Sequence, residues 1–78
     1  FFVYILINAN GRYYIGQTNN LSKRLFQHNN DRFGYTRKFR PWKLVYYESF
    51  TTHAFALKRE KEIKSYKGGL KFKQLLVL

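Results

Sequence analysis

The chain has 78 residues, and its 15 Lys and Arg against 4 Asp and Glu give a formal net charge of +11. So large a surplus attracts polyanions, with nucleic acid the first candidate and an anionic membrane the second. Cysteine is absent and histidine occurs twice, which excludes a disulfide framework and zinc sites built from cysteine or from several histidines.

The distribution of the charged residues narrows the function further. The basic residues are interleaved with aromatic ones instead of forming one amphipathic helix, and no apolar run approaches the ~20 residues of a membrane span. We therefore expect a cytoplasmic protein that binds nucleic acid and no membrane. If a metal takes part, oxygen must hold it, and the available carboxylates are those of Asp31, Glu48, Glu60 and Glu62.

The first half of the chain opens with a predicted hairpin. Residues 1–7 are apolar on both alternating faces, which predicts a central strand that is covered on both sides. An Asn-Gly pair at positions 10–11 follows, the strongest short signal for a hairpin turn. Residues 12–17 are then expected to return as the second strand. Tyr4 lies on the first of these strands and Tyr14 on the second.

The register of this hairpin decides whether Tyr4 and Tyr14 can share a site. Side chains alternate between the two faces of a sheet, so a regular ladder closed by an even-length loop would send these tyrosines to opposite faces. A shared site requires a loop with an odd number of residues or a bulge, for which Gly11 or Gly16 is available. We predict such an irregularity.

Three cap-forming polar residues precede a helix that is expected to run from Leu21 to about Asn29. Leu21 and Leu25 are one turn apart and are expected to face the core. Arg24 and His28 form a second pair with the same spacing on the neighbouring flank. Two side chains that can carry positive charge are thus predicted side by side at the edge of the buried face.

A basic segment separates this helix from the rest of the chain. Residues 29–41 are polar and irregular, and they are expected to form a long loop. Such a loop suits contact with phosphate groups, although a run of charges that is only solvated gives the same pattern. The basic residues of the loop are Arg32, Arg37, Lys38 and Arg40.

The second half of the chain completes the predicted fold. Residues 42–50 are rich in aromatic and β-branched side chains and predict the third strand. Two threonines then cap a helix expected over residues 53–66, which two glycines end. A closing helix over residues 70–78 is expected to pack through Leu70, Leu75, Leu76 and Leu78. The order strand, strand, helix, strand, helix, helix predicts one α/β (α+β) domain over residues 1–78, with helices flanking a three-stranded antiparallel sheet.

One acidic side chain interrupts the inward face of the helix over residues 53–66. Ala56, Glu60, Ile63 and Lys67 share one stripe, whereas Glu62 is rotated about 200° from Glu60 and is expected in solvent. A carboxylate against the core needs a partner, because burying it alone costs several kcal/mol. Glu60 is therefore the acidic residue for which a special environment is predicted.

The triplets Val3-Tyr4-Ile5 and Tyr14-Ile15-Gly16 resemble the two signature triplets of the GIY-YIG nuclease family, with Val3 in place of the first glycine. The likeness continues in the expected order over nearly the whole chain and is similar to the small single-domain members. Its further blocks are Thr18-Asn19-Asn20-Leu21, Arg24, His28-Asn29, Leu44-Val45-Tyr46 and Arg59-Glu60-Lys61-Glu62-Ile63-Lys64.

The resemblance implies metal-dependent hydrolysis of DNA phosphodiester bonds by a site that contains Tyr4, Tyr14, Arg24, His28 and Glu60. The family's single carboxylate binds one divalent ion, so Glu60 is expected to hold one Mg2+ (or Mn2+). Water on this ion is expected to lose a proton towards Tyr14 or Tyr4. Arg24 is expected to stabilise the charge that develops on the phosphate, with assistance from His28.

The resemblance and the charge also indicate where DNA would lie. The residues expected to contact it are Gln17, Asn20, Arg32, Arg37, Lys38, Arg40 and Lys64. Gln17 stands where some members of the family have a basic residue, and Phe72 or Gln74 lies near a position where they have an amide. The sequence leaves open whether the DNA is branched, damaged or plain duplex.

Each of these roles has a structural alternative. Glu60 and Lys64 have the i,i+4 spacing of an ion pair, and Arg24 could be an ordinary surface arginine. His53 fits no motif and is expected at a helix start. For the function, the alternatives are a catalytically silent nucleic-acid-binding module of the same fold and a subunit that a partner protein activates.

Overall fold

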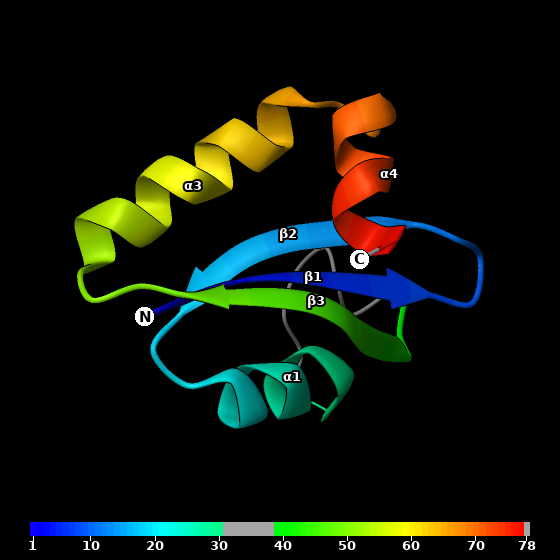
Figure 1. Cartoon of the computed structure of the whole chain (residues 1–78). Coiled ribbons are helices and arrows are strands. Elements are labelled where there is room, and N and C mark those ends of the chain that lie inside the picture. The colour runs from blue at the N-terminus through cyan, green and yellow to red at the C-terminus, as the bar shows by residue number, and fades with distance from the viewer. Residues whose placement is uncertain (31–38, 78) are drawn as a thin grey trace.

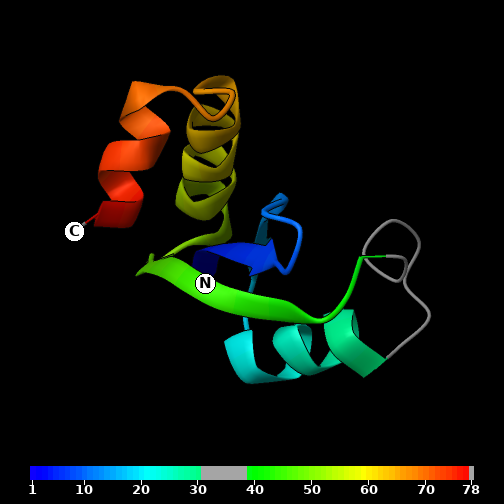
Figure 2. The same cartoon turned by 90° about the vertical axis from the view of Figure 1, so that its right-hand side faces the viewer.

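The computed structural model describes residues 1–30 and 39–77. Its elements are β1 (Phe2–Asn8), β2 (Tyr13–Thr18), α1 (Leu21–Asn30), β3 (Trp42–Ser49), α3 (His53–Ser65) and α4 (Leu70–Val77). The strands form an antiparallel sheet in the order β2-β1-β3. Helices α3 and α4 cover one face of this sheet and α1 lies on the other (Figure 1, Figure 2). The predicted fold, with the first strand in the centre, is confirmed.

Asn8 organises the turn between β1 and β2. Its side-chain Oδ1 accepts hydrogen bonds from the backbone N–H groups of Asn10, at 3.0 Å, and of Arg12, at 2.9 Å. Gly11 has a φ of 78°, in the left-handed region that glycine enters without a steric penalty. An asparagine that bonds the backbone ahead of it and a glycine with positive φ together explain why the chain reverses here.

The ladder between β1 and β2 is regular and has Ile7 paired with Tyr13 nearest to the turn. The five residues 8–12 lie between these two positions, so the predicted irregularity is present as an odd-length loop, the first of the two forms that the sequence allowed. Because side chains alternate along each strand, this register puts Tyr4 and Tyr14 on the same face of the sheet.

The bulge in the sheet lies on the other side of β1. The pairing of β1 with β3 shifts between Ile5, which is opposite Tyr46, and Leu6, which is opposite Leu44. Val45 is the extra residue on β3. Neither glycine that the sequence offered for a bulge is used in that way, because the odd loop alone brings the two tyrosines together.

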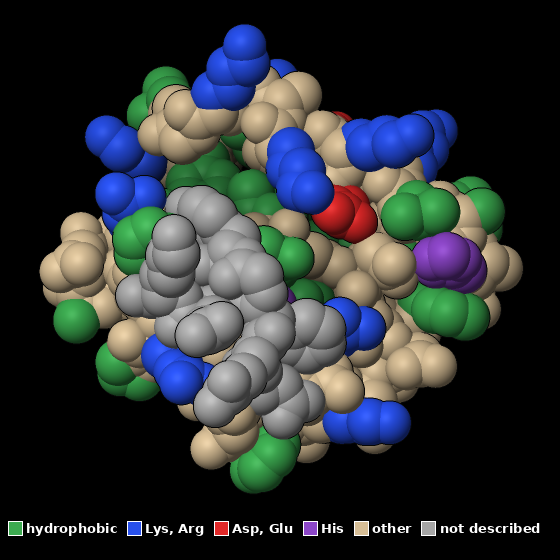
Figure 3. All heavy atoms as spheres, turned by 180° about the vertical axis from the view of Figure 1, so that it is seen from behind, with side chains coloured by type: hydrophobic (Ala, Val, Ile, Leu, Met, Phe, Trp, Pro, Cys, Tyr) green, Lys and Arg blue, Asp and Glu red, His purple; other side chains and the backbone are tan. Residues whose placement is uncertain are grey.

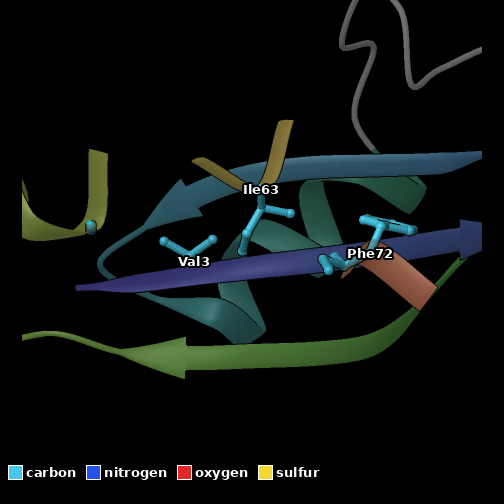
Figure 4. Close-up of a cluster of buried hydrophobic side chains, with 5 residues drawn as sticks. Val3, Ile63 and Phe72 are labelled. Carbon is cyan, nitrogen blue, oxygen red and sulfur yellow. The ribbon is translucent and has the colours of Figure 1, made fainter. Parts of the chain in front are cut away.

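The core between the sheet and helices α3 and α4 is apolar. Val3 and Ile5 from β1 meet Ile63 from α3 and Phe72 from α4, and each of these side chains is buried (Figure 4). Burial of one such side chain contributes about 1.5–3 kcal/mol to folding. This cluster therefore holds both helices on the sheet.

Helix α4 turns a different residue inward from the one predicted. Leu70 is 72% exposed, whereas Phe72 is 3% exposed, and Leu75 and Leu76 pack beside it. These inward positions have the spacing i, i+3, i+4, and Leu70 lies two residues before the first of them, about 200° around the helix. Leu78, also predicted to pack, lies outside the described residues.

Helix α3 begins where the sequence predicts and ends one residue earlier. The Thr52 hydroxyl accepts a hydrogen bond from the N–H of Phe55 at 3.2 Å, as an N-cap does. The helix ends at Ser65, and Lys67 and Gly68 then adopt φ values of 51° and 72°. Lys67, predicted on the inward stripe, therefore lies beyond the helix in the left-handed turn that stops it.

None of the helices in the described part of the chain is long and apolar enough to cross a membrane. The longest, α3, has 13 residues, whereas a spanning helix needs ~20. The cytoplasmic location stays a prediction.

Candidate active site

Two polar side chains from distant parts of the chain meet in the core on the α1 side of the sheet. The Tyr4 hydroxyl and Nε2 of His28 are hydrogen-bonded at 2.9 Å, and each residue is only 3% exposed. His28 was predicted at the edge of the buried face, and the structure corrects this. It follows Leu21 and Leu25 with the spacing i, i+4, i+7, so it continues the stripe that packs on the sheet.

Tyr14 joins this pair from the neighbouring strand. Its ring lies edge to face against the His28 imidazole, with 4.8 Å between the ring centroids, and 6.3 Å from the ring of Tyr4. Unlike Tyr4, Tyr14 is only half-buried. The structure thus brings together three of the predicted site residues, two from the sheet and one from α1.

Gly16 provides the space that Tyr4 occupies. A Cβ atom on Gly16 would lie 2.6 Å from Oη of Tyr4, 2.8 Å from its Cζ and 3.1 Å from Cε1 of Tyr14. Carbon atoms do not approach that closely, so any larger residue would displace the phenol. Gly16 was considered for a bulge, but its role is to let the Tyr4 side chain lie across β2. The sequence signal for this role is the position of Gly16 at the end of the second triplet, Tyr14-Ile15-Gly16.

Burial, followed by the charged groups nearby, sets the protonation states of the cluster. The pKa of Tyr4 is raised well above its ordinary value, first by burial, then by Tyr14 and Glu60, while Arg24 opposes the increase. Burial, with Arg24 second, lowers the pKa of His28 below its ordinary value of 6.5. At neutral pH the cluster therefore holds a protonated phenol and a neutral imidazole. Arg24 and Glu60, from α1 and α3, both act electrostatically on one hydroxyl.

Glu60 is largely buried and has a basic partner. Its side chain is 15% exposed, and Oε2 accepts a hydrogen bond from Nζ of Lys64 at 2.6 Å. Lys64 is 54% exposed, so the ion pair is closed by a solvent-facing side chain that can move away. The i,i+4 ion pair between Glu60 and Lys64 is therefore formed, and it engages the carboxylate that was predicted to bind the metal.

The other acidic residues of the described chain are held by one arginine. Arg59 binds Glu48 with Nε and Nη2, at 2.8 Å and 2.9 Å, and donates from Nη1 to Glu62 at 2.8 Å. The Tyr46 hydroxyl also donates to Glu48. These contacts keep the pKa values of Glu48 and Glu62 below their ordinary range. Among the described carboxylates, Glu60 alone lies outside this network; Asp31 is not described.

A polar hollow lies beside Arg24. It has a volume of about 220 Å³, and its lining residues are Phe1, Gln17, Thr18, Asn19, Arg24 and His53. Arg24 also lines a second, smaller hollow that includes Asn20, whose Oδ1 caps α1 by accepting from the N–H of Lys23 at 3.0 Å. Seen from behind, the surface carries many basic side chains, with acidic atoms visible between them (Figure 3).

The donor set limits how a metal could bind. The described residues contain no group of three or more His, Cys, Asp or Glu side chains that could enclose an ion. Mg2+ keeps several of its waters and is commonly bound by one or two carboxylates together with phosphate oxygens. A single carboxylate at Glu60 fits that ion, provided that Lys64 releases it.

The predicted DNA contacts are only partly described. Gln17 and Asn20 line the two hollows beside Arg24, and Lys64 is engaged with Glu60. Arg40 donates from Nη1 to the carbonyl oxygen of Asn29 at 3.2 Å, next to the start of β3. The others, Arg32, Arg37 and Lys38, lie outside the described residues.

Sequence reasoning did not place Phe1 or His53 near the predicted site. Both line the same hollow as Arg24, although His53 does begin a helix as expected. No motif or periodicity links them, because one residue precedes the sheet and the other follows it, 52 positions later along the chain. Only the pairing of the chain around β1 and β3 brings them together.

The fold and this cluster define a small α+β domain of the kind that the two tyrosine triplets suggested. The family described as the GIY-YIG catalytic domain matches residues 1–72. The chain therefore belongs to the GIY-YIG family, a nuclease family that acts on DNA and generally uses divalent metal ions.

Several relatives have been named as UPF0213 proteins. One from Staphylococcus epidermidis is 43% identical over 75 residues, which cover 95% of this chain and 92% of the relative. Another, from Syntrophus aciditrophicus, is 43% identical over 65 residues, covering 81% and 75% of the two chains. The solution NMR structure of a UPF0213 protein from Bacillus halodurans is similar with a TM-score of 0.56 and 31% identity, covering 97% of this chain and 80% of that one.

Proposed function

We propose that this protein is an endonuclease that hydrolyses DNA phosphodiester bonds with one divalent cation, Mg2+ or Mn2+, held by Glu60. The observation that carries the proposal is the packing of two tyrosines against one histidine, with a hydrogen bond of 2.9 Å between Tyr4 and His28 and 4.8 Å between the ring centroids of Tyr14 and His28. After burial, Tyr14, the cation of Arg24 and the anion of Glu60 all act electrostatically on the Tyr4 hydroxyl. Titratable groups whose pKa values are shifted, gathered near charged side chains, are typical of a functional site, and the family to which the chain belongs acts on DNA.

Arg24 is the group proposed to hold the scissile phosphate. It lines both hollows on this side of the molecule, and a planar guanidinium can donate two parallel hydrogen bonds to phosphate oxygens. Its charge stabilises the negative charge that grows on the phosphate during attack by water.

Tyr4 and Tyr14 are proposed to have different roles. Tyr4 is buried, has a raised pKa and is hydrogen-bonded to neutral His28, so it is a poor proton acceptor and is suited to donating a hydrogen bond. Tyr14 is half-buried and is the proposed acceptor of the proton from the attacking water. His28 is proposed to position the Tyr4 hydroxyl. A divalent cation at Glu60 would supply positive charge that polarises the phosphate and acidifies water.

DNA affinity is proposed to come from the charge of the whole chain. Gln17, Asn20, Arg40 and Lys64 join Arg24 as proposed contacts, together with the basic residues between positions 31 and 38. Contacts of this kind are made mainly to phosphates and do not select a sequence. Binding should therefore weaken steeply as the salt concentration rises.

Cleavage of a labelled DNA with and without Mg2+ tests the proposal. Glu60→Gln keeps the size of the side chain but removes its charge, and it should lower the rate by about a thousand-fold, since a catalytic metal contributes several kcal/mol. Glu62→Gln is the matched control, because it removes the same charge from an exposed position on the same helix. Equal cleavage by wild type and Glu60→Gln would reject Glu60 as the metal ligand.

A second function is favoured by the Glu60–Lys64 ion pair. A carboxylate that is permanently neutralised by a lysine would leave a nucleic-acid-binding module without catalysis. In that case the chain binds DNA with the same salt dependence but does not cleave branched, damaged or duplex DNA at any Mg2+ concentration. Recovery of cleavage in a cell extract would instead identify a subunit that a partner protein activates.

A further inference from the structure

An aromatic pair lines the Arg24 hollow and has no part in the proposed chemistry. The ring of Phe1 and the imidazole of His53 are stacked, with 5.3 Å between their centroids and 26° between their planes. Phe1 is 42% exposed, and His53 is exposed as well. Two rings stacked on one another in contact with water present a flat apolar surface beside a cation.

The backbone holds this pair in place. Phe50, just after β3, donates its N–H to the carbonyl oxygen of Phe1 at 2.7 Å, which fixes Phe1 beside the end of the sheet. His53 is the first residue of α3, directly after the N-cap Thr52. Because both residues are attached to secondary structure, the stacked surface exists before a ligand arrives.

The dimensions and the lining of the hollow restrict its ligand. Its volume of about 220 Å³ is below the ~300–1,000 Å³ of clefts that enclose a whole drug-sized molecule, so it suits one part of a larger ligand. Its lining combines Arg24 and the polar residues Gln17 and Asn19 with the two rings. A nucleotide matches both, since its phosphate binds arginine and its base stacks on aromatic side chains.

We propose that Phe1 and His53 form a stacking platform for one unpaired nucleobase next to the phosphate bound by Arg24. The position of that phosphate rests on the proposed function. Bases inside an intact duplex are stacked on their neighbours and have no free face for the platform, whereas a bulged, frayed or flapped base has one. The preferred substrate is therefore DNA with an unpaired nucleotide beside the bond that is cut.

The platform is tested by binding in the presence of a metal chelator, so that no DNA is cut. Two DNAs with equal numbers of phosphates are compared, one fully paired and one with a single bulged 2-aminopurine. Wild type should bind the bulged DNA about 5- to 100-fold more tightly, the range expected for stacking of one base. Fluorescence of the 2-aminopurine should be quenched on binding, which reports stacking directly.

Two variants and one control locate the effect. Phe1→Leu and His53→Leu remove one ring each and should bring the preference for bulged DNA close to one, with the salt dependence of binding unchanged. Phe55→Leu removes an aromatic ring that is 57% exposed on the same helix but outside the hollow, so it should keep the preference. Thermal unfolding of each variant shows that it is folded, and either variant alone suffices for the comparison.

The outcomes separate this inference from the proposed function. Equal affinity of wild type for the two DNAs, or an undiminished preference in the folded variants, would overturn the platform. Cleavage of both DNAs with Mg2+ but no preference would reject the platform and leave the nuclease proposal intact. A preference for bulged DNA that depends on Phe1 and His53, without any cleavage, would support the platform and reject the nuclease proposal.

Discussion

On one face of β1, Val3 and Ile5 are fully buried among apolar side chains of α3 and α4. On the other face, Tyr4 is almost as buried, but it is hydrogen-bonded to His28 and lies in a space left by Gly16. Both faces exclude water, yet Tyr4 and His28, the hydrogen-bonded pair that is almost fully buried, lie on the second. Depth of burial therefore does not distinguish a structural core from a functional site, whereas the presence of buried, hydrogen-bonded polar groups does.

The two faces should respond differently to substitution because their interactions differ in direction. Apolar packing is non-directional, so a lost contact acts mainly on stability. Hydrogen bonds and charges depend on position, and a shift of a few tenths of an ångström changes what they can bind.

The largest change in stability is expected for Ile63→Ala on the apolar face. Ile63 has no solvent exposure, so its truncation should lower the free energy of unfolding by about 2–5 kcal/mol through lost burial and a residual cavity. Urea unfolding measures this loss. Glu60 lies one turn from Ile63 on α3, so cleavage by the fraction that remains folded should fall, but by much less than in Glu60→Gln. A loss of cleavage as large as that of Glu60→Gln would show that packing on the apolar face fixes the site.

Gly16→Ala addresses the polar face and should lower the free energy of unfolding by about 1–3 kcal/mol, since the new Cβ overlaps the Tyr4 phenol. Cleavage should fall as well, because the hydroxyl of Tyr4 must move. Tyr4→Phe removes the oxygen that the Cβ would meet at 2.6 Å, so Gly16→Ala should be less destabilising in that background. Strictly additive effects on unfolding in the double variant would contradict this account of Gly16.

His28 should make the stability of the polar face depend on pH. Its pKa is lowered in the folded protein, so below about pH 6.5 the unfolded chain takes up a proton that the folded protein does not bind. The free energy of unfolding is then greatest above about pH 6.5 and decreases on acidification, by at most about 1.4 kcal/mol per pH unit for one proton. Urea unfolding between about pH 7 and about pH 5 measures this slope.

Replacement of either histidine provides the comparison for that slope. His28→Asn should reduce the dependence of the free energy of unfolding on pH, whatever the stability of the variant at neutral pH. His53→Asn leaves His28 in place and should retain that dependence. A steep slope that persists in His28→Asn would assign the acid sensitivity to carboxylates, such as Glu48 in its pairing with Arg59.

The smallest change in stability is expected for Lys64→Met, about 1 kcal/mol, because the lysine is half-exposed and the freed carboxylate of Glu60 keeps some contact with water. If Lys64 competes with metal for Glu60, the Mg2+ concentration that gives half-maximal cleavage should fall a few-fold. Lys61→Met is the control, because it removes the same charge from an exposed position on the same helix. It should need more Mg2+ for half-maximal cleavage than Lys64→Met does. Identical Mg2+ dependence in the two variants would argue against the competition.

Local patterns in the sequence were sufficient for the order of the elements and much of the site. A strand that is apolar on both faces has to be central, Thr52 caps α3, and the Asn-Gly turn reverses the chain between β1 and β2. Alternation along the strands also required an odd-length loop or a bulge between Tyr4 and Tyr14, and the register of the hairpin decides for the loop. These features depend on neighbours a few residues away, which the sequence displays directly.

Tertiary packing decided which side chains are buried and which charges pair. His28 faces the core instead of lying at its edge, and Phe72 packs inward where Leu70 was predicted to pack. Arg59 forms ion pairs with Glu48 and Glu62, and Lys64 forms one with Glu60. Such outcomes depend on the rotation of each helix on the sheet and on contacts between distant segments. A periodic pattern leaves that rotation open by a residue or two, and one residue is enough to exchange a buried side chain for an exposed one.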